Sequence, residues 1–268
     1  MRETAFAKIN LALHVRGRRD DGYHALETLF AFVDAGDELV VSPAAQDELI
    51  TVGEFGTELT DPFDNIVAKA LSTLSRPQGW AVTLDKQLPV AAGLGGGSAD
   101  AGAIFRMVER EYGLPDDWMA RAAKLGADVP ACVKSLTCVG KGTGTKLKYI
   151  DNNLAGMPVL LVNPRIPLST GPVFKGWDGV DRGPLPSGSV SEITFRGRNH
   201  LEQSALNLCP IISEMFRVLR QTSPRLYRMS GSGATCFALY KDDLALQIAS
   251  DMVREEWGGW WQMSGHLR

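Results

Sequence analysis

Alternating apolar and polar positions predict five strands before the middle of the chain. In a half-buried strand every second residue faces the core, and each of these segments repeats with that period. They span residues 6–16, 23–32, 37–41, 49–52 and 81–87. In the first strand Lys8 and Asn10 are two residues apart, so both side chains point to the same face. Taken alone, a solvated strand face explains this pair, because lysine is mostly exposed in proteins.

Apolar residues at helical spacing predict five helices. Asp64 and Asn65 precede the first helix and could cap it, and a glycine follows the second and the third. The predicted helices span residues 66–74, 101–112, 118–125, 208–219 and 244–257. Strands predicted at 159–162 and 235–240 alternate with the last two helices, which favours an α+β second domain. The change in pattern before residue 159 places a domain boundary near Leu154.

A glycine-rich stretch lies between a predicted strand and a predicted helix. Its short side chains let the backbone approach a bulky anion, with N–H groups and the start of a helix pointing at the negative charge. The stretch is Pro89, Val90, Ala91, Ala92, Gly93, Leu94, Gly95, Gly96, Gly97, Ser98 and Ala99. It lacks the Gly-Lys-Ser/Thr of a Walker A motif, and Ser98 stands where a dinucleotide-binding loop has its last glycine. The pattern predicts a phosphate-binding loop, with a flexible connection as the alternative.

Some residues allow both a functional and a plain structural interpretation. Tyr23 and His24 follow a turn and could hold a planar ring or pack a hairpin. Asp128 could simply cap a turn that Pro130 shapes. We interpret the remaining unusual stretches as a hairpin at 139–144, a cleft-covering segment at 164–188, a tight turn at 228–234 and tryptophan packing at 257–261.

Composition and charge describe an ordinary globular protein. The 268 residues suffice for one large or two modest domains, with 44% hydrophobic and 22% charged residues. The net charge of -3 offers no general field for nucleic acid or an acidic membrane. The four cysteines form no Cys-x-x-Cys pair, which predicts reduced core thiols rather than a zinc site. Lys8 and Asn10 interrupt the apolar N-terminus and no apolar run is long enough to span a membrane, so we expect a cytoplasmic protein.

Three separated motifs together resemble the GHMP kinase superfamily, which includes galactokinase, homoserine kinase and mevalonate kinase. They are Ala7-Lys-Ile-Asn-Leu11, the glycine-rich stretch that ends in Ser98-Ala99, and Met229-Ser-Gly-Ser-Gly-Ala234. Three more resemble the branch that phosphorylates a cytidine-diphosphate form of methylerythritol in non-mevalonate isoprenoid synthesis. They are Asp21-Gly-Tyr-His-Ala-Leu-Glu-Thr28, Asp64-Asn65 and Leu125-Gly-Ala-Asp-Val-Pro130. The resemblance covers nearly the whole chain in the right order.

This resemblance implies an ATP-dependent kinase with an α+β fold in two domains. Residues 1–154 would form an N-terminal ATP-binding domain like the second domain of ribosomal protein S5. Residues 155–268 would form a ferredoxin-like C-terminal domain, with the active site in the cleft between the two. ATP and Mg²⁺ would be the cofactors and the cytidylyl alcohol the substrate, with no nucleic acid or membrane partner. A monomer and a homodimer both remain open.

The resemblance also implies roles for the two candidate catalytic residues. Asp128 matches the base that takes the proton from the 2-hydroxyl group as that oxygen attacks the γ-phosphorus of ATP. Lys8 matches its partner, and its ammonium would stabilise the charge that develops on the transferring phosphoryl group.

Further positions match the nucleotide site of the family. The loop from Pro89 to Ala99 would hold the phosphates, and Ser98 would reach the magnesium ion. Asn65 and Lys86 would lie near the nucleotide. The turn at 231–234 would close over the active site.

Five positions match substrate contacts. Tyr23 and Phe174 would sandwich the cytosine ring, and His24 would read its hydrogen-bonding edge. Asn10 would contact the methylerythritol. Thr170 precedes Phe174 in the matching segment and would be a weaker contact.

Two positions depart from the family pattern, and two other functions remain as alternatives. Gly102 stands where the family usually has alanine and should weaken the start of its helix by up to about 1 kcal/mol. Asp100 occupies a position where relatives have Asn or Asp, and we interpret it as structural. A small-alcohol kinase of the mevalonate or homoserine type would not need Tyr23, His24 and Phe174. The other alternative is a non-catalytic RNA-binding module, against which the net charge of -3 argues.

Overall fold

The computed structural model describes residues 1–59 and 65–268, so Asp64 and its predicted capping role lie outside the described residues. The chain forms two compact units. The first comprises residues 1–8, 35–90 and 95–135, and the second comprises residues 9–34, 91–94 and 136–268. The chain passes between the units more than once because the long paired strands β1 (Arg2–Arg18) and β2 (His24–Ala44) run through both.

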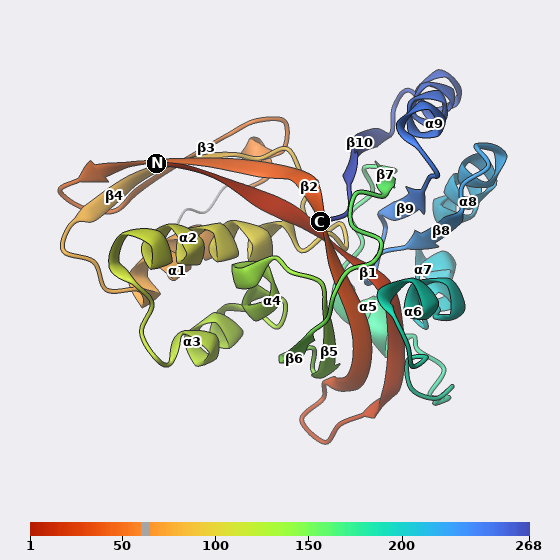
Figure 1. The fold of residues 1–268 in the computed structure, drawn as a ribbon, viewed down its shortest axis with the longest axis horizontal. Helices are drawn as coiled ribbons and strands as arrows, with labels where there is room; N and C mark the ends of the chain where they lie inside the picture. The colour runs from red at the N-terminus through yellow and green to blue at the C-terminus, as the bar shows by residue number, and fades with distance from the viewer. Residues whose placement is uncertain (60–64) are drawn as a thin grey trace. The chain divides into compact units, whose positions relative to one another are not determined.

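The first unit combines a sheet with a group of helices (Figure 1). Strand β4 (Gly79–Asp85) pairs antiparallel with β2 over residues 38–44 and parallel with β3 (Glu48–Val52). The helices contact one another, with α2 lying against both α1 and α4. They are α1 (Ile66–Thr73), α2 (Gly96–Tyr112), α3 (Trp118–Leu125) and α4 (Val129–Lys134), with a short 3-10 helix at Gly56–Glu58.

Strand β2 replaces two strands that the pattern predicts separately, at 23–32 and 37–41. Gly36 lies at the join, and a Cβ atom there would be 2.0 Å from the carbonyl oxygen of Ala5. The absence of a side chain lets β2 continue past the neighbouring chain without a break. The separate-strand prediction is therefore wrong, because a glycine that reads as a break in the pattern serves here as a close backbone approach.

Two helices of this unit differ from their predicted form. Helix α2 begins at Gly96, five residues before the predicted start, after Gly95 adopts a left-handed backbone conformation with φ 61°. Residues 129–134, predicted as a turn, form the helix α4 with Pro130 in its first turn, where a missing N–H group costs nothing. A segment this short shows no clear helical period, and its burial from Val129 to Val133 stabilises it.

The second unit contains an antiparallel sheet in the strand order β10-β7-β9-β8. These strands are β7 (Pro158–Asn163), β8 (Leu226–Met229), β9 (Cys236–Leu239) and β10 (Trp261–His266). The predicted hairpin at 139–144 is confirmed as β5 (Cys138–Gly142) and β6 (Lys146–Tyr149), and β5 also pairs with residues 26–30 of β2. The sequence pattern does not predict β10, although it correctly predicts packing for the tryptophans. Trp257 stacks on Trp260 at 4.7 Å, and Trp261 is buried at the start of the strand.

The helices of this unit pack against its sheet and against one another. They are α5 (Thr170–Lys175), α6 (Val190–Arg196), α7 (Glu202–Leu208), α8 (Ile211–Gln221) and α9 (Asp243–Glu256). Helices α8 and α9 confirm the two predicted helices, shifted by up to three residues. Helices α5, α6 and α7 were not predicted, because six or seven residues are too few for a helical period to stand out.

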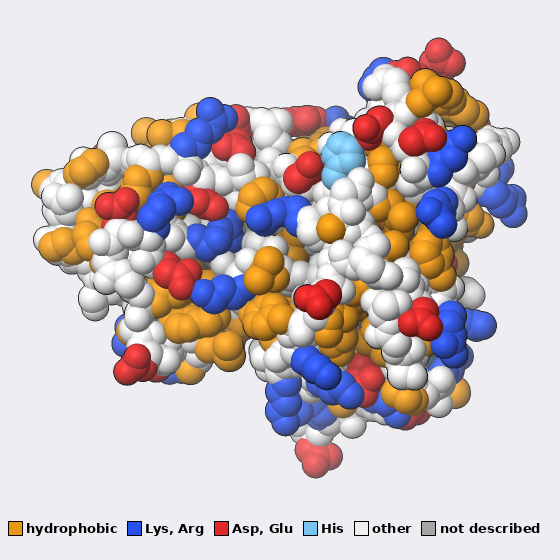
Figure 2. All heavy atoms as spheres, in the orientation of Figure 1, with side chains coloured by type: hydrophobic (Ala, Val, Ile, Leu, Met, Phe, Trp, Pro, Cys, Tyr) orange, Lys and Arg blue, Asp and Glu red, His pale blue; other side chains and the backbone are white. Residues whose placement is uncertain are grey.

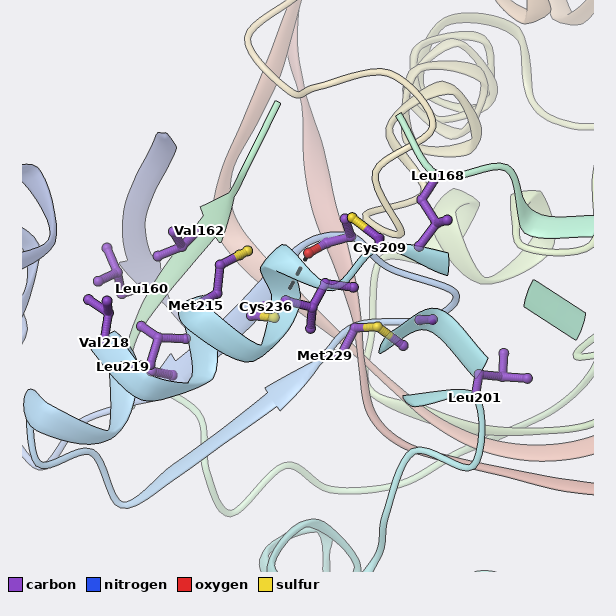
Figure 3. Packing of buried hydrophobic residues seen from close by; sticks show 14 of the residues in the cluster. Leu160, Val162, Leu168, Leu201, Cys209, Met215, Val218, Leu219, Met229 and Cys236 are labelled. Carbon is purple, nitrogen blue, oxygen red and sulfur yellow. Dashed lines mark hydrogen bonds between the residues drawn. The ribbon is translucent and has the colours of Figure 1, made fainter. Parts of the chain in front are cut away.

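Buried aliphatic side chains from strands and helices form the core of the second unit. Leu160 and Val162 of β7 lie in one cluster with Met215, Val218 and Leu219 of α8 (Figure 3). Burying an aliphatic side chain of this size contributes roughly 1.5 to 3 kcal/mol, so the cluster anchors α8 to the sheet.

The surface carries charges of both signs. Figure 2 shows Lys and Arg side chains interspersed with Asp and Glu over one face of the molecule. Within residues 1–59 and 65–268, no helix has the length and apolar character that crossing a bilayer requires. All four cysteines are buried, as expected for core thiols.

Candidate active site

The first unit brings Lys8 and Asp128 together. Lys8 lies on β1, Asp128 directly precedes α4, and their side chains form an ion pair with 3.0 Å between Lys8 Nζ and Asp128 Oδ2. The Lys8 side chain is only 4% exposed, whereas that of Asp128 is 31% exposed. Asp128 makes no capping hydrogen bond to α4 through its side chain, so the plain interpretation as a cap is wrong. The pair is a buried cation that supports a carboxylate with one accessible side.

Gly95 passes closely over this pair. A Cβ atom at Gly95 would lie 2.9 Å from Lys8 Cε and 3.6 Å from Asp128 Oδ2, and its φ of +61° is one that glycine adopts without strain. The glycine-rich loop and the ion pair are therefore in direct contact. Any side chain at this position would push the lysine out of place.

The last part of the glycine-rich loop is the first turn of α2. Ala99 N donates to the Gly95 carbonyl oxygen at 2.7 Å, so the preceding N–H groups of Gly96, Gly97 and Ser98 have no acceptor within the helix. Three successive N–H groups at the positive end of a helix of 17 residues form an anion-binding arrangement. The structure thus supports the phosphate-binding interpretation of the loop rather than a flexible connection.

The first part of the loop differs in character. Pro89, Ala92 and Leu94 are buried, and Ala91 has a positive φ of 52°. Residues 91–94 belong to the second unit. The carbonyl oxygens of Ala92 and Gly93 accept hydrogen bonds from Thr235 N and Ser230 Oγ, so contacts other than those of α2 hold this part of the loop.

Lys86 is buried beneath Gly96 between two carboxylates. Its ammonium pairs with Asp37 and, at 3.0 Å, with Asp100 Oδ2, and all three side chains are at most 2% exposed. Asp37 Oδ1 also accepts hydrogen bonds from the backbone N–H groups of Gln87 and Leu88. This cluster is a support for the loop, and it explains why Lys86 does not lie exposed beside the loop.

Lys86 and Asp100 both have raised pKa values in this cluster. Burial opposes the charge of Lys86, but its contacts with Asp100 and Asp37 outweigh burial, and the pKa of Lys86 is raised. Burial, with the nearby charge of Asp37, raises the pKa of Asp100 to about 8. At neutral pH the two raised pKa values favour an ammonium on Lys86 and a proton on the Asp100 carboxyl. This agrees with the structural interpretation of Asp100.

Asn65 caps helix α1, as the plain interpretation predicts. Its Oδ1 accepts a hydrogen bond from Val67 N at 2.9 Å. Its Nδ2 is buried and has no hydrogen-bond partner among the residues that the structure describes. A buried amide donor left over from capping is available to a ligand.

In the second unit Asn10 is tied to a neighbouring strand and to a glycine turn. Its Nδ2 donates to Thr28 Oγ1 at 2.7 Å, and its backbone N–H donates to Ser230 Oγ at 3.2 Å. A Cβ atom on Gly231 would lie 3.1 Å from Asn10 Oδ1. The side chain predicted to contact the substrate thus has its orientation set by Thr28 and lies beside the glycine turn.

The glycine turn is held by a residue that the sequence did not reveal. Asn199 Nδ2 donates to the carbonyl oxygens of Met229 and Gly231, both at 2.8 Å. Ser230 Oγ in turn donates to the Gly93 carbonyl oxygen at 2.8 Å, and Thr235 N donates to that of Ala92. Thr170 Oγ1 and Ser232 Oγ are 3.0 Å apart, which also ties α5 to the turn. An asparagine in a loop carries no motif of its own, so only the folded chain identifies this clamp.

An aromatic cluster forms around His24. Its ring centroid lies 5.2 Å from that of Phe174 and 5.8 Å from that of Trp177, which meets it edge-on at 85°. Tyr23 is 66% exposed on the adjoining turn. Burial, and after it the charge of Arg18, lower the pKa of His24 and favour a neutral ring. Trp177 was missed in the sequence, although an aromatic residue three positions after Phe174 could have indicated it.

A pair of stacked histidines, His14 and His200, ties the segment around Gly183 to β1. The rings of His14 and His200 stack at 4.1 Å. His14 Nε2 accepts from Arg198 N, His200 Nδ1 accepts from Val15 N, and the remaining His14 nitrogen contacts the Gly183 carbonyl oxygen at 3.1 Å. Burial lowers the pKa of both rings, and the neighbouring His14 helps to bring that of His200 to about 4. Both rings act as neutral acceptors.

The donor set fits a magnesium ion only if the ion arrives with a nucleotide. Across residues 1–59 and 65–268 no group of three or more His, Cys, Asp or Glu side chains could hold a metal. The hydroxyl of Ser98 lies in the first turn of α2, beside the anion-binding N–H groups. Because Mg²⁺ usually takes few protein ligands and is bound through phosphates and water, this sparse oxygen set fits it.

Family models match both parts of the chain. The model of the GHMP kinases N terminal domain matches residues 65–135, and the model described as GHMP kinases C terminal matches residues 190–259. The first match contains the whole glycine-rich loop from Pro89 to Ala99, and the second contains the turn that follows Arg228.

Curated relatives match over the full length. The chain is 66% identical to a 4-diphosphocytidyl-2-C-methyl-D-erythritol kinase of Novosphingobium aromaticivorans, over 100% of this chain and 93% of the relative. It is 58% identical to the enzyme of the same name from Erythrobacter litoralis, over 99% of both chains.

Solved structures match the fold. A crystal structure of 4-(cytidine 5'-diphospho)-2C-methyl-D-erythritol kinase superposes with a TM-score of 0.84 at 34% identity, over 100% of this chain and 99% of the other. The homoserine kinase of Cytophaga hutchinsonii superposes with a TM-score of 0.68 at 16% identity, over 97% and 95% of the two chains. The second match concerns the fold alone.

Proposed function

This chain belongs to the GHMP kinases, within their 4-diphosphocytidyl-2-C-methyl-D-erythritol kinase family, and we propose that it phosphorylates the 2-hydroxyl group of that cytidylyl alcohol. The products are the 2-phosphate and ADP, and the step belongs to non-mevalonate isoprenoid synthesis. The predicted family and its two-domain α+β fold are confirmed. The relatives support this reading over a mevalonate or homoserine kinase and over a non-catalytic RNA-binding module.

The observation that carries the mechanism is the pair of Lys8 and Asp128 beneath Gly95. Asp128 accepts the proton of the 2-hydroxyl group through the accessible side of its carboxylate, while the oxygen forms a bond to the γ-phosphorus and the bond to ADP breaks. The buried ammonium of Lys8, 3.0 Å away, orients this carboxylate and lies where it can stabilise charge on the transferring group. A positioned general base of this kind contributes about 10² to 10⁴ in rate.

The start of α2 binds the phosphates in this proposal. The N–H groups of Gly96, Gly97 and Ser98 point at the anion, and the buried cluster around Lys86 holds them in place. Ser98 would hold a magnesium ion bound with ATP, and the ion would neutralise charge between the phosphates. The buried Nδ2 of Asn65 would donate to the nucleotide.

The second unit supplies the contacts to the acceptor substrate. Tyr23 and Phe174 enclose the cytosine ring and His24 binds its edge, supported by the ring contacts of His24 and the exposure of Tyr23. Asn10 binds the methylerythritol, and Thr170 makes a weaker contact. Because His24 is held neutral by burial, one of its nitrogens accepts a hydrogen bond and the other donates one.

We also propose a domain division at residue 154 and a cytoplasmic location. The two family models match on either side of Leu154, which supports the division. We propose no nucleic acid partner, and the oligomeric state is left as monomer or homodimer.

The test is an ADP-release assay in which the purified protein receives Mg-ATP and one acceptor at a time. We expect turnover with 4-diphosphocytidyl-2-C-methyl-D-erythritol and none with mevalonate or homoserine. Turnover with one of the other alcohols would overturn the cytosine site, and turnover with none would overturn the kinase assignment. The Asp128→Asn variant should lose turnover while it still binds ATP.

A further inference from the structure

Trp177 is the second aromatic ring, beside Phe174, that packs against His24. It lies two residues after the end of α5 and is only 4% exposed, although Gly176 and Asp178 on either side of it are exposed. Its ring meets His24 edge-on at 85° and 5.8 Å, while Phe174 approaches the same imidazole at 5.2 Å. His24 is therefore enclosed by two rings from one short segment.

The backbone of Trp177 is held in place from a distant part of the chain. The Arg18 guanidinium donates to the carbonyl oxygens of Trp177 at 2.9 Å and of Lys175 at 3.3 Å. Trp177 N donates to the Phe174 carbonyl oxygen at 3.1 Å. With its backbone held at both groups and its ring buried, the indole is positioned before any ligand binds.

Two polar atoms of this cluster are buried without a partner. Neither His24 Nε2 nor Trp177 Nε1 makes a hydrogen bond to any residue that the structure describes. A buried polar atom without a partner is costly and calls for an explanation, and a ligand that pairs with it is one such explanation. The indole nitrogen can only donate a hydrogen bond, and a nitrogen of a neutral imidazole can accept one. A ligand that pairs with both atoms therefore needs one acceptor and one donor.

We propose that Trp177 is a specificity-determining residue of the base site, which orients His24 and donates its indole N–H group to an acceptor atom of the bound cytosine. This rests on the proposed function, which places the cytidylyl group beside His24. Cytosine offers an acceptor at N3, where uracil carries an N–H group. An indole N–H group that donates to N3 would therefore favour cytosine over uracil.

The test compares Trp177→Phe with Trp257→Phe. The first variant keeps an aromatic ring but removes the N–H group. The second removes an indole nitrogen that is likewise buried without a partner among the described residues, on the stacked pair with Trp260. Binding of CDP and UDP without ATP is measured by calorimetry, and steady-state kinetics are measured with the cytidylyl substrate.

We expect Trp177→Phe to raise the dissociation constant of CDP and the KM of the cytidylyl substrate about three- to tenfold, as for one neutral hydrogen bond. The preference for CDP over UDP should fall by a similar factor, while kcat and the KM of ATP change less than twofold. Trp257→Phe should match the wild type in all four quantities. Equal behaviour of the two variants, or an unchanged preference for CDP over UDP, overturns the proposal.

Two further outcomes separate this inference from the proposed function. A wild type that binds CDP through Trp177 but does not turn over the cytidylyl alcohol keeps the base site and overturns the reaction. If the wild type turns over the alcohol and Trp177→Phe leaves CDP binding and the KM of the cytidylyl substrate unchanged, the reaction stands and the role of Trp177 is overturned. If Trp177→Phe does not fold, the ¹⁵N–¹H resonances of the six wild-type indoles are followed instead. A CDP-induced shift that Trp257→Phe retains supports the proposal, and no shift overturns it.

Discussion

Replacing Gly95 by alanine should slow catalysis more than it destabilises the fold. The new Cβ atom would lie 2.9 Å from Lys8 Cε, so the lysine chain has to move. The φ of +61° adds a cost of about 1 to 2 kcal/mol for a residue with a side chain. Because one kcal/mol shifts Tm by about 2 to 4 °C in a chain of this size, we expect a loss of roughly 2 to 8 °C.

The catalytic effect follows from the displaced ammonium. A misplacement of about 1 Å in a reacting constellation can cost on the order of 10² in rate, so kcat should fall about 10- to 100-fold. The assay is ADP release with saturating Mg-ATP and the cytidylyl substrate, combined with a thermal melt. Gly113→Ala is the control for backbone strain away from the ion pair, because Gly113 has a φ of +78° and a ψ of 163°, a more strained conformation than that of Gly95, but nothing within 4 Å of its Cβ position. The reasoning is refuted if Gly95→Ala keeps a kcat within twofold of Gly113→Ala.

Three other predictions concern charge. Asp128→Asn should lower kcat by about 10² to 10⁴ with ATP affinity preserved in calorimetry, and near wild-type turnover would contradict its role as the base. The lowered pKa values of His14 and His200 mean that the unfolded chain binds more protons below pH 6.5, so stability should fall as pH drops from 6.5 towards 4. Allowing for partial exposure, we expect a loss of about 1 to 2 kcal/mol in urea melts at pH 5, which His200→Gln should reduce. The raised pKa of Asp100 has the opposite sign, because the folded chain keeps a proton that the unfolded chain releases, so the contribution of this one group to stability should fall as pH rises from 4 to 8. Asp100→Asn should gain stability relative to the wild type across that range, and parallel pH curves for the two proteins would contradict the protonated state.

The long periodic elements were predictable because their pattern is local. Strands β3, β4 and β7 and helices α1, α3, α8 and α9 lie where the spacing of apolar residues places them. The short helices α5, α6 and α7 have too few residues for a period, and contacts with distant segments stabilise them. Strand β10 pairs with β7, so its existence depends on a partner about a hundred residues earlier in the chain.

The candidate site divides in the same way. The glycine-rich loop, and the motifs around Lys8, Tyr23 and Asp128, are visible in the sequence and led to the right family. Trp177 and Asn199 belong to no motif, so nothing local distinguishes them from packing residues. Only the folded chain shows that Trp177 Nε1 is buried without a partner among the described residues and that Asn199 Nδ2 donates to two backbone carbonyl oxygens.

By itself the sequence determined the periodic elements, the position of the glycine-rich loop and the membership of a kinase family. Only the tertiary structure decided which polar residues are buried and which residues they pair with. On a strand pattern Lys8 is most simply a solvated lysine, yet its side chain is 4% exposed and pairs with Asp128. The family resemblance places Lys86 near the nucleotide, and the structure adds that its ammonium is enclosed by Asp37 and Asp100. The reason is physical, since the charge state and role of such a group depend on desolvation and on partners far away in the chain.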